Sequence, residues 1–214
     1  MNAGVLRRPL GGIGLLLVLL SLAGCTAAAP SPSIVMLAPN STQAAMGVRD
    51  TVYNPPRPAP ALQLTDQDGR PFDLTSLRGT PVFVYFGYTH CPDVCPTTLA
   101  DLRAAIQAAS LPAKVVFVTV DPARDTAPAM KQYVDAYQAG FMGLTGTARQ
   151  IATAAAAWGV QYQQGPVDSL GNYPMIHSTD VYLVDPGGTL RNHIFFGASS
   201  ALIGQLLHTV SGQG

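Results

Sequence analysis

The sequence predicts an α/β domain in which helices cover both faces of a central mixed sheet. Two runs of nearly consecutive apolar residues, at 82–86 and 114–120, are typical of strands that are buried on both faces. A segment with helical spacing of apolar residues follows each run, so strands and helices alternate along the chain. The length of 214 residues suffices for one domain of good size and an N-terminal appendage.

The composition argues against a nucleic-acid-binding protein. Only 11% of the residues are charged, the formal net charge is zero, and the sequence has no Lys/Arg block. The three cysteines argue against a disulfide-stapled scaffold, because one lies in the leader region and two lie in a single short motif. The cysteine pair is therefore expected to serve chemistry or to form its own bridge.

Residues 1–25 have the anatomy of an export signal. Arg7 and Arg8 form a basic start, and the apolar run Leu10–Leu20 that follows is too short for a comfortable transmembrane span. The small residues before Cys25 resemble a bacterial lipobox. This resemblance implies cleavage before Cys25, lipidation of its thiol, and a mature protein anchored to the outer face of the bacterial cytoplasmic membrane. Two alternatives remain open: an uncleaved signal anchor, or ordinary cleavage a few residues later.

Residues 26–60 are predicted to be a spacer rather than a second domain. The segment is rich in Ala, Pro and Ser, and its run Tyr53–Pro60 favours extended polyproline-like backbone. Part of this run could pack onto the domain as an edge strand, which the sequence leaves open. The folded domain is expected at 61–214.

The domain is expected to begin with a β-hairpin, because alternating apolar residues flank the turn Asp66–Gly69. Asp125 or Thr126 is expected to cap a helix. A second hairpin is indicated around Asp185–Gly188, and the Gly- and Pro-containing segment 161–175 is interpreted as a loop or hairpin excursion. The other expected elements, in chain order, are a helical turn at 76–79, a strand at 82–86, a helix from 96 to about 110, a strand at 114–120, a helix at 127–138, a short strand at 141–144, a helix at 147–158, strands at 178–184 and 189–195, and a helix at 198–210.

Cys91 and Cys95 lie between the strand at 82–86 and the helix that follows it. This placement, together with the order of elements, describes a thioredoxin-like α/β sandwich. At a helix N-terminus the unpaired N–H groups and the helix dipole favour thiolate over thiol, so low thiol pKa values are expected. The spacing has one residue more than Cys-x-x-Cys but still permits a disulfide. The residues alone leave open a redox pair, a soft-metal clamp and a structural disulfide.

His177 is the third candidate ligand, because it immediately precedes the expected strand at 178–184. In thioredoxin-like folds the loop that enters this strand faces the cysteine loop. Two cysteine sulfurs and one imidazole nitrogen suit copper, especially Cu(I). A structural zinc site would want a fourth protein ligand, and the domain has no further cysteine.

Several other side chains near these positions carry weaker expectations. His90 is expected to point away from the sulfurs, and Met175 to be either a soft contact or a packing residue. Asp121 and Arg124 end a strand beside the cysteine loop, where they could support the ligands or only form the turn. The two remaining histidines are expected to be solvated: His193 and His208.

Three sequence blocks occur in order between Pro60 and Val210. They are Gly-Tyr-Thr-His-Cys-Pro-Asp-Val-Cys-Pro-Thr-Thr, then Val-Thr-Val-Asp-Pro-Ala-Arg-Asp-Thr, and a late His-Ser before a Tyr-Leu-Val-Asp strand. Together they resemble the Sco/SenC family of copper chaperones. The resemblance implies a copper ion, Cu(I) or Cu(II), held by the residues that match the motif: Cys91, Cys95 and His177.

The resemblance also implies a recipient. Family members deliver copper to, or reduce the cysteines of, the binuclear copper site of a cytochrome c oxidase subunit, and other copper carriers are possible partners. This chain departs from the family in one respect, since Ile176 stands where the family often has Asp directly before the ligand histidine. The support that a carboxylate could give the imidazole then falls to Asp93, Asp121 or backbone groups.

Three functions remain open. The leading hypothesis is a copper metallochaperone, tethered to the membrane through Cys25, that passes the ion on by ligand exchange with an acceptor's thiols. The second is a thiol–disulfide oxidoreductase with Cys91 and Cys95 as its redox pair. A thiol peroxidase is a weaker third, because nothing in the sequence singles out one cysteine. His177 separates the first hypothesis from the second, since an oxidoreductase does not need it.

Overall fold

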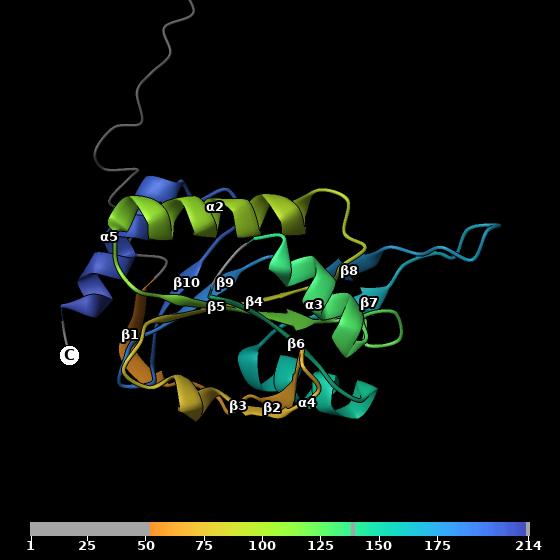
Figure 1. The fold of residues 1–214 in the computed structure, drawn as a ribbon, viewed down its shortest axis with the longest axis horizontal. Coiled ribbons are helices and arrows are strands. Elements are labelled where there is room, and N and C mark those ends of the chain that lie inside the picture. The colour runs from red at the N-terminus through yellow and green to blue at the C-terminus, as the bar shows by residue number, and fades with distance from the viewer. Residues whose placement is uncertain (1–51, 138–139, 213–214) are drawn as a thin grey trace, which may run out of the picture. The chain divides into compact units, whose positions relative to one another are not determined.

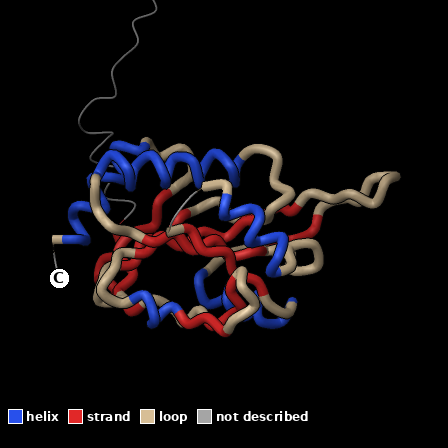
Figure 2. The backbone as a smooth tube through the Cα atoms, in the orientation of Figure 1, coloured by secondary structure: helices blue, strands red, loops and turns tan. Residues whose placement is uncertain are grey.

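An eight-stranded mixed sheet forms the centre of the domain (Figures 1 and 2). The computed structural model describes residues 52–137 and 140–212; the expected leader, Cys25 and most of the expected spacer lie outside them. The strands lie in the order β1-β10-β9-β4-β5-β6-β2-β3. Their bounds are β1 (Val52–Pro58), β2 (Gln63–Asp66), β3 (Pro71–Asp73), β4 (Val82–Gly87), β5 (Lys114–Thr119), β6 (Phe141–Thr145), β9 (Val181–Val184) and β10 (Thr189–Ile194).

Helices cover both faces of this sheet, as the sequence predicts. Helices α2 and α5 pack on each other and α3 packs on β6, and these three lie on one side of the central strands, whereas α4 lies on the other (Figure 1). The described helices are the short 3-10 helix η1 (Leu74–Leu77), α2 (Val94–Ala109), α3 (Ala127–Asp135), α4 (Ala148–Trp158) and α5 (Ser200–Ser211). Within the described ranges, no helix has the length and apolar character needed to cross a membrane.

The two central strands explain the continuous apolar runs of the sequence. Strand β4 pairs parallel with β5 and antiparallel with β9. Every residue of β4 is buried, and so is every residue of β5 except Lys114. Strands covered on both faces have no solvent-facing side, so polar residues do not alternate along them. Strand β4 ends at Gly87, which places the cysteine loop at the carboxyl end of the most buried strand.

Both expected hairpins are confirmed, and the excursion at 161–175 is a third. Strand β2 pairs with β3 around the first turn, and β9 pairs with β10 around the second. Strands β7 (Tyr162–Gln164) and β8 (Met175–His177) form a separate two-stranded sheet. The strand expected at 178–184 begins only at Val181, because the chain up to His177 pairs with β7 instead. Helix α3 ends at Asp135, earlier than expected.

The proline-rich run before Ala61 contributes a strand to the sheet. Strand β1 pairs antiparallel with β10 at one edge. Three of its seven residues are prolines, which lack the N–H donor and are tolerated at an edge rather than within a sheet. The Tyr53 ring stacks on His193 with centroids 6.3 Å apart, and the Arg57 guanidinium carbon lies 4.7 Å from the Tyr53 ring centroid. Part of the expected spacer therefore packs as an edge strand, an alternative that the sequence left open.

Replacing Tyr53 by Ala tests the contribution of β1. The change is expected to lower the free energy of unfolding by about 1 kcal/mol, because the aromatic stack on His193 and the cation–π contact with Arg57 are both lost. Val52→Ala is the control, since the Val52 side chain is 45% exposed, and it should change stability by less than about 0.5 kcal/mol. Urea denaturation of the full chain measures both variants. If Tyr53→Ala is as stable as the control, β1 does not stabilise the fold.

Candidate metal centre

The cysteine pair lies where the chain passes from β4 into α2. Cys95 lies in the first turn of α2 and is completely buried, whereas Cys91 lies just before the helix and is partly exposed. The backbone N–H of Cys95 donates to the Cys91 sulfur at 3.3 Å. Both cysteines are free thiols. The helix start therefore brings the two sulfurs together, as the sequence predicts.

Gly87 makes room for the Cys95 sulfur. A Cβ atom at this position would lie 2.7 Å from the Cys95 sulfur and 2.6 Å from the Phe117 ring. Contacts this short do not occur in folded proteins, so any side chain at position 87 would displace the thiol or the ring. Glycine fits at the end of β4 because the Cys95 sulfur and the Phe117 ring fill the space that a side chain would need.

His177 completes the group from a different part of the fold. It is the last residue of β8, and its Nε2 atom lies 3.7 Å from the Cys95 sulfur. Its Nδ1 atom lies 2.7 Å from the backbone oxygen of Ser178, an acceptor, so Nδ1 carries the proton and donates. The lone pair of Nε2 therefore faces the thiols. One ligand atom from each of Cys91, Cys95 and His177 lies within 4.8 Å of the others.

Burial favours the neutral forms of two members of this group, Cys95 and His177. Burial raises the pKa of the Cys95 thiol to about 12, although the Tyr85 hydroxyl donates to its sulfur at 3.5 Å and favours the thiolate. Burial also lowers the pKa of His177. The expectation of a low pKa from the helix N-terminus is thus wrong for Cys95, since the loss of solvation outweighs the dipole. A metal ion must displace the thiol proton to bind there.

Two tyrosines, Tyr85 and Tyr88, pack beside the His177 ring. The Tyr88 ring lies edge-on to the His177 ring with centroids 5.8 Å apart, and the Tyr85 ring centroid lies 6.5 Å from it. Both tyrosines are buried. The aromatic rings exclude water from one side of the imidazole and leave Cys91 as the partly exposed member of the group.

The isoleucine in place of the family's aspartate does not disturb the imidazole. Adjacent residues of a strand point to opposite faces, so the side chain of Ile176 projects away from that of His177, and it is 54% exposed. The Ser178 carbonyl already accepts the Nδ1 proton. A backbone group thus holds the ring, which is one of the options that the sequence left open.

Neither aspartate considered as support for the ligands touches them. Among the described residues, Asp93 and Asp121 form no hydrogen bond with the three candidate ligands. Asp93 is exposed at the N-cap of α2 and makes no capping bond with its side chain; among the described residues, its carboxylate accepts only from the Thr97 hydroxyl, at 3.5 Å. Asp121 is 3% exposed and accepts from Arg124 Nε and from the Tyr173 hydroxyl.

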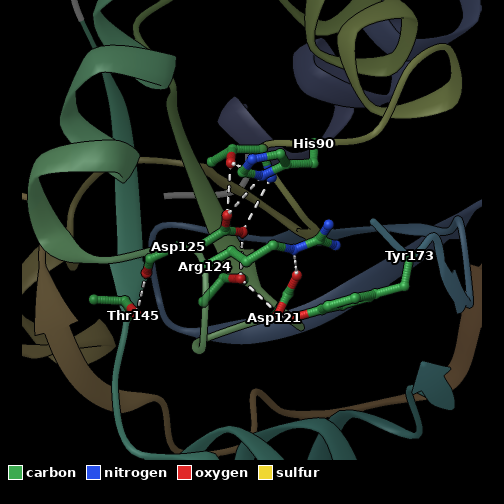
Figure 3. Close-up of polar contacts among 8 residues, drawn as sticks. His90, Asp121, Arg124, Asp125, Thr145 and Tyr173 are labelled. Carbon is green, nitrogen blue, oxygen red and sulfur yellow. Dashed lines mark hydrogen bonds and ion pairs between the residues drawn. The ribbon is translucent and has the colours of Figure 1, made fainter. Parts of the chain in front are cut away.

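Asp125 has a role that the sequence reasoning missed. Its fully buried carboxylate accepts from the backbone N–H of Thr89 at 3.0 Å, and from the hydroxyls of Thr89 and Thr119 at 2.6 Å each (Figure 3). It therefore ties the cysteine loop to the end of β5. Asp125 does not cap α3; Thr126, the other residue expected there, occupies the N-cap position without a side-chain bond. The sequence signal for this role was the position of Asp125 four residues after Asp121, in the loop that follows a buried strand.

The other candidates lie outside the group. His90 contacts the Thr89 hydroxyl at 3.0 Å and lies 3.7 Å from Asp125, away from the sulfurs as expected. Met175 is partly buried and packs against the core. His208 is exposed, as expected. His193 is not solvated as predicted, because it stacks on Tyr182 with centroids 5.2 Å apart and is only 28% exposed.

Comparison with known proteins agrees with this geometry. The SCO1/SenC family model matches residues 53–210. A protein of Stutzerimonas stutzeri that is named as copper-binding is 40% identical over 144 residues, which cover 64% of this chain and 69% of that protein. The mitochondrial SCO2 homologue of Bos taurus is 38% identical over 135 residues, which cover 61% of this chain and 51% of that protein. The chain thus spans about half the length of this mitochondrial relative.

A solved structure is similar in fold as well as in sequence. The crystal structure of Arabidopsis thaliana ScoI with copper bound has a TM-score of 0.68 and is 28% identical, over 72% of this chain and 98% of that one. This likeness confirms the thioredoxin-like fold that the order of elements predicts. From the extent of the family match and the identity to its relatives, the chain belongs to the SCO1/SenC family.

Proposed function

We propose that this protein binds a copper ion through Cys91, Cys95 and His177 and passes it to an acceptor protein. The observation that carries the proposal is the convergence of two thiols and one imidazole nitrogen within 4.8 Å. Two sulfurs and one nitrogen form a soft site of low coordination number, which suits Cu(I). A relative of this chain is named as copper-binding, and a structural neighbour was solved with copper bound.

The copper ion is cargo, and the chain's own residues prepare its transfer. The hydrogen bond from Nδ1 of His177 to Ser178 keeps Nε2 free as a donor. Binding releases the Cys95 proton, so uptake and proton loss are coupled. Cys91 is the more exposed thiolate, so an acceptor thiolate replaces it first: a new sulfur–copper bond forms as the bond to Cys91 breaks. The Cys95 and His177 bonds would then break as further ligands of the acceptor bind the ion, and Cys95 would take up a proton again.

The acceptor in this proposal is the binuclear copper site of a cytochrome c oxidase subunit, as the family resemblance implies. A lipid on Cys25 tethers the protein to the outer face of the bacterial cytoplasmic membrane, and residues 26–51 give the domain reach. The support for the tether is the anatomy of the leader.

A thiol–disulfide oxidoreductase is the second candidate. The observation in its favour is that Cys91 and Cys95 are both free thiols and lie close together in space. Cys91 would attack a partner disulfide, and Cys95 would resolve the mixed disulfide and release the partner as a dithiol. The raised pKa of Cys95 opposes rapid resolution, because little thiolate is present at neutral pH.

Replacing His177 by Ala tests the three-ligand site. Cu(II) affinity is expected to fall by roughly tenfold or more, because a nitrogen donor is lost. Cu(I) affinity should change little, because both thiolates remain. Anaerobic titration against a competing chelator gives the affinities, and X-ray absorption gives the sulfur and nitrogen neighbours of copper. His90→Ala is the matched control, since His90 adjoins Cys91 but contacts Thr89 instead of the group. Unchanged binding of both copper states by His177→Ala would exclude the site.

Alkylation tests the raised pKa and the burial of Cys95. Because the pKa of Cys95 lies above its ordinary value, less of it is thiolate at pH 8 than of an exposed cysteine, and the thiolate fraction rises about tenfold per pH unit up to that pKa. With iodoacetamide at pH 8, we expect Cys91 to react roughly tenfold or more faster than Cys95. Peptide mass spectrometry of the metal-free protein measures both rates, and both should become equal in urea. Rapid labelling of Cys95 in the folded protein would instead favour the redox pair.

A further inference from the structure

The candidate ligands come from two separate parts of the fold. Cys91 and Cys95 follow β4 of the large sheet, whereas His177 ends β8 of the two-stranded sheet. No strand pairing joins β7 or β8 to the large sheet in the described residues. The distance between the imidazole and the sulfurs therefore depends on the short chain that leads from His177 into β9 and on the side-chain contacts that hold the β7–β8 hairpin against the rest of the domain.

One such contact joins the loop after β5 to Tyr173, which lies two residues before β8. The Tyr173 hydroxyl donates to Oδ1 of Asp121 at 3.1 Å, and Arg124 Nε donates to Oδ2 of the same carboxylate. The Arg124 guanidinium carbon lies 3.7 Å from the Tyr173 ring centroid (Figure 3). A buried carboxylate thus holds a phenol and a guanidinium that also stack on each other.

The guanidinium depends on Tyr173 for part of its support. The Arg124 side chain is 20% exposed, and its buried Nη2 atom has no hydrogen-bond partner among the described residues. Arg124 therefore does not form a two-pronged bond with Asp121. Its place is set by the single Nε bond and by the ring of Tyr173 beneath it.

The same guanidinium extends the contact towards the ligand histidine. Its carbon lies 5.8 Å from the centroid of the Tyr88 ring, and that ring lies edge-on to His177. Arg124 thus lies between the tyrosine that precedes β8 and the tyrosine that packs on the imidazole.

We propose that Asp121, Arg124 and Tyr173 form a latch that positions His177 over the cysteines. The three latch residues touch none of the candidate ligands; they act by holding the β7–β8 hairpin to the loop after β5. With the latch closed, the imidazole lies within reach of the Cys95 sulfur. With the latch open, two thiolates remain as donors, and the ion is easier to pass on. This inference rests on the proposed copper site.

Two substitutions of Tyr173 test the latch in the full-length protein. Tyr173→Ala removes both the hydroxyl and the ring, and is expected to lower Cu(II) affinity roughly tenfold while Cu(I) affinity changes little. Tyr173→Phe keeps the ring under Arg124 and should have a smaller effect. Tyr53→Ala is the matched control, because it removes another tyrosine stacked with an arginine, on β1 and far along the chain from the hairpin. It should leave copper binding unchanged.

A double substitution separates positioning from general loss of structure. If the latch acts through His177, Tyr173→Ala causes no further loss of Cu(II) affinity once His177 is already Ala. An equal loss in both backgrounds would overturn the latch. X-ray absorption of Tyr173→Ala with Cu(II) should also show fewer nitrogen neighbours, as in His177→Ala.

Hydrogen exchange in the metal-free protein tests the latch independently of copper. Tyr173→Ala should speed amide exchange in β7 and β8 by roughly tenfold and leave α2 unchanged. Unchanged exchange in β7 and β8 would overturn the latch even if copper binds as proposed. If His177→Ala binds both copper states normally while exchange rises, the copper site is wrong and the latch remains as a hairpin contact. The two failures are thus distinguishable.

Discussion

Close packing at the carboxyl end of β4 is the constraint on which the site depends. The strand is buried along its whole length, and the Cys95 sulfur fits beside it only because residue 87 has no side chain. The sulfur in turn fixes the geometry of the group, since Cys91 lies one helical turn before it and the imidazole nitrogen lies 3.7 Å away. A thiol held by the sheet itself cannot shift without disturbing the core around Phe117.

The same burial determines the electrostatics of the site. Cys95 and His177 both favour their neutral forms, so the empty site places no isolated charge among the tyrosines that line it. Exchange of thiol protons for a copper ion keeps the net buried charge small, because each negative sulfur gains a positive neighbour. Two thiolates and a neutral imidazole would leave one negative charge with Cu(I) and none with Cu(II), so loading changes the buried charge by one unit at most.

The sequence predicts the local features of this protein well; among long-range contacts it predicts the approach of His177 to the cysteines but not the contacts of Asp125. Apolar runs and turn residues suffice for the central strands and the hairpins. The cysteine motif indicated Cys91 and Cys95, and the place of His177 before a strand of the thioredoxin-like order indicated the third candidate ligand. A helix N-terminus lowers the pKa of a solvated thiol, but Cys95 is buried in the core, and the loss of solvation raises its pKa instead. Asp125 has the local signature of a helix cap, but its carboxylate binds Thr89, 36 residues away in sequence. The strand at 52–58 is hidden by its prolines, which are compatible with a strand only at a sheet edge.

Those prolines have a consequence for self-association. An unpaired sheet edge can recruit a strand from another molecule through its free N–H and C=O groups, which is a common start of aggregation. The outermost strand at one edge, β1, contains Pro55, Pro56 and Pro58, and the outermost strand at the other, β3, begins with Pro71. Each proline lacks an N–H group, so these edge strands have fewer backbone donors than other strands of their length. Both borders of the sheet are therefore poor templates for strand addition, and neighbouring copies of the protein can stand close together without joining their sheets.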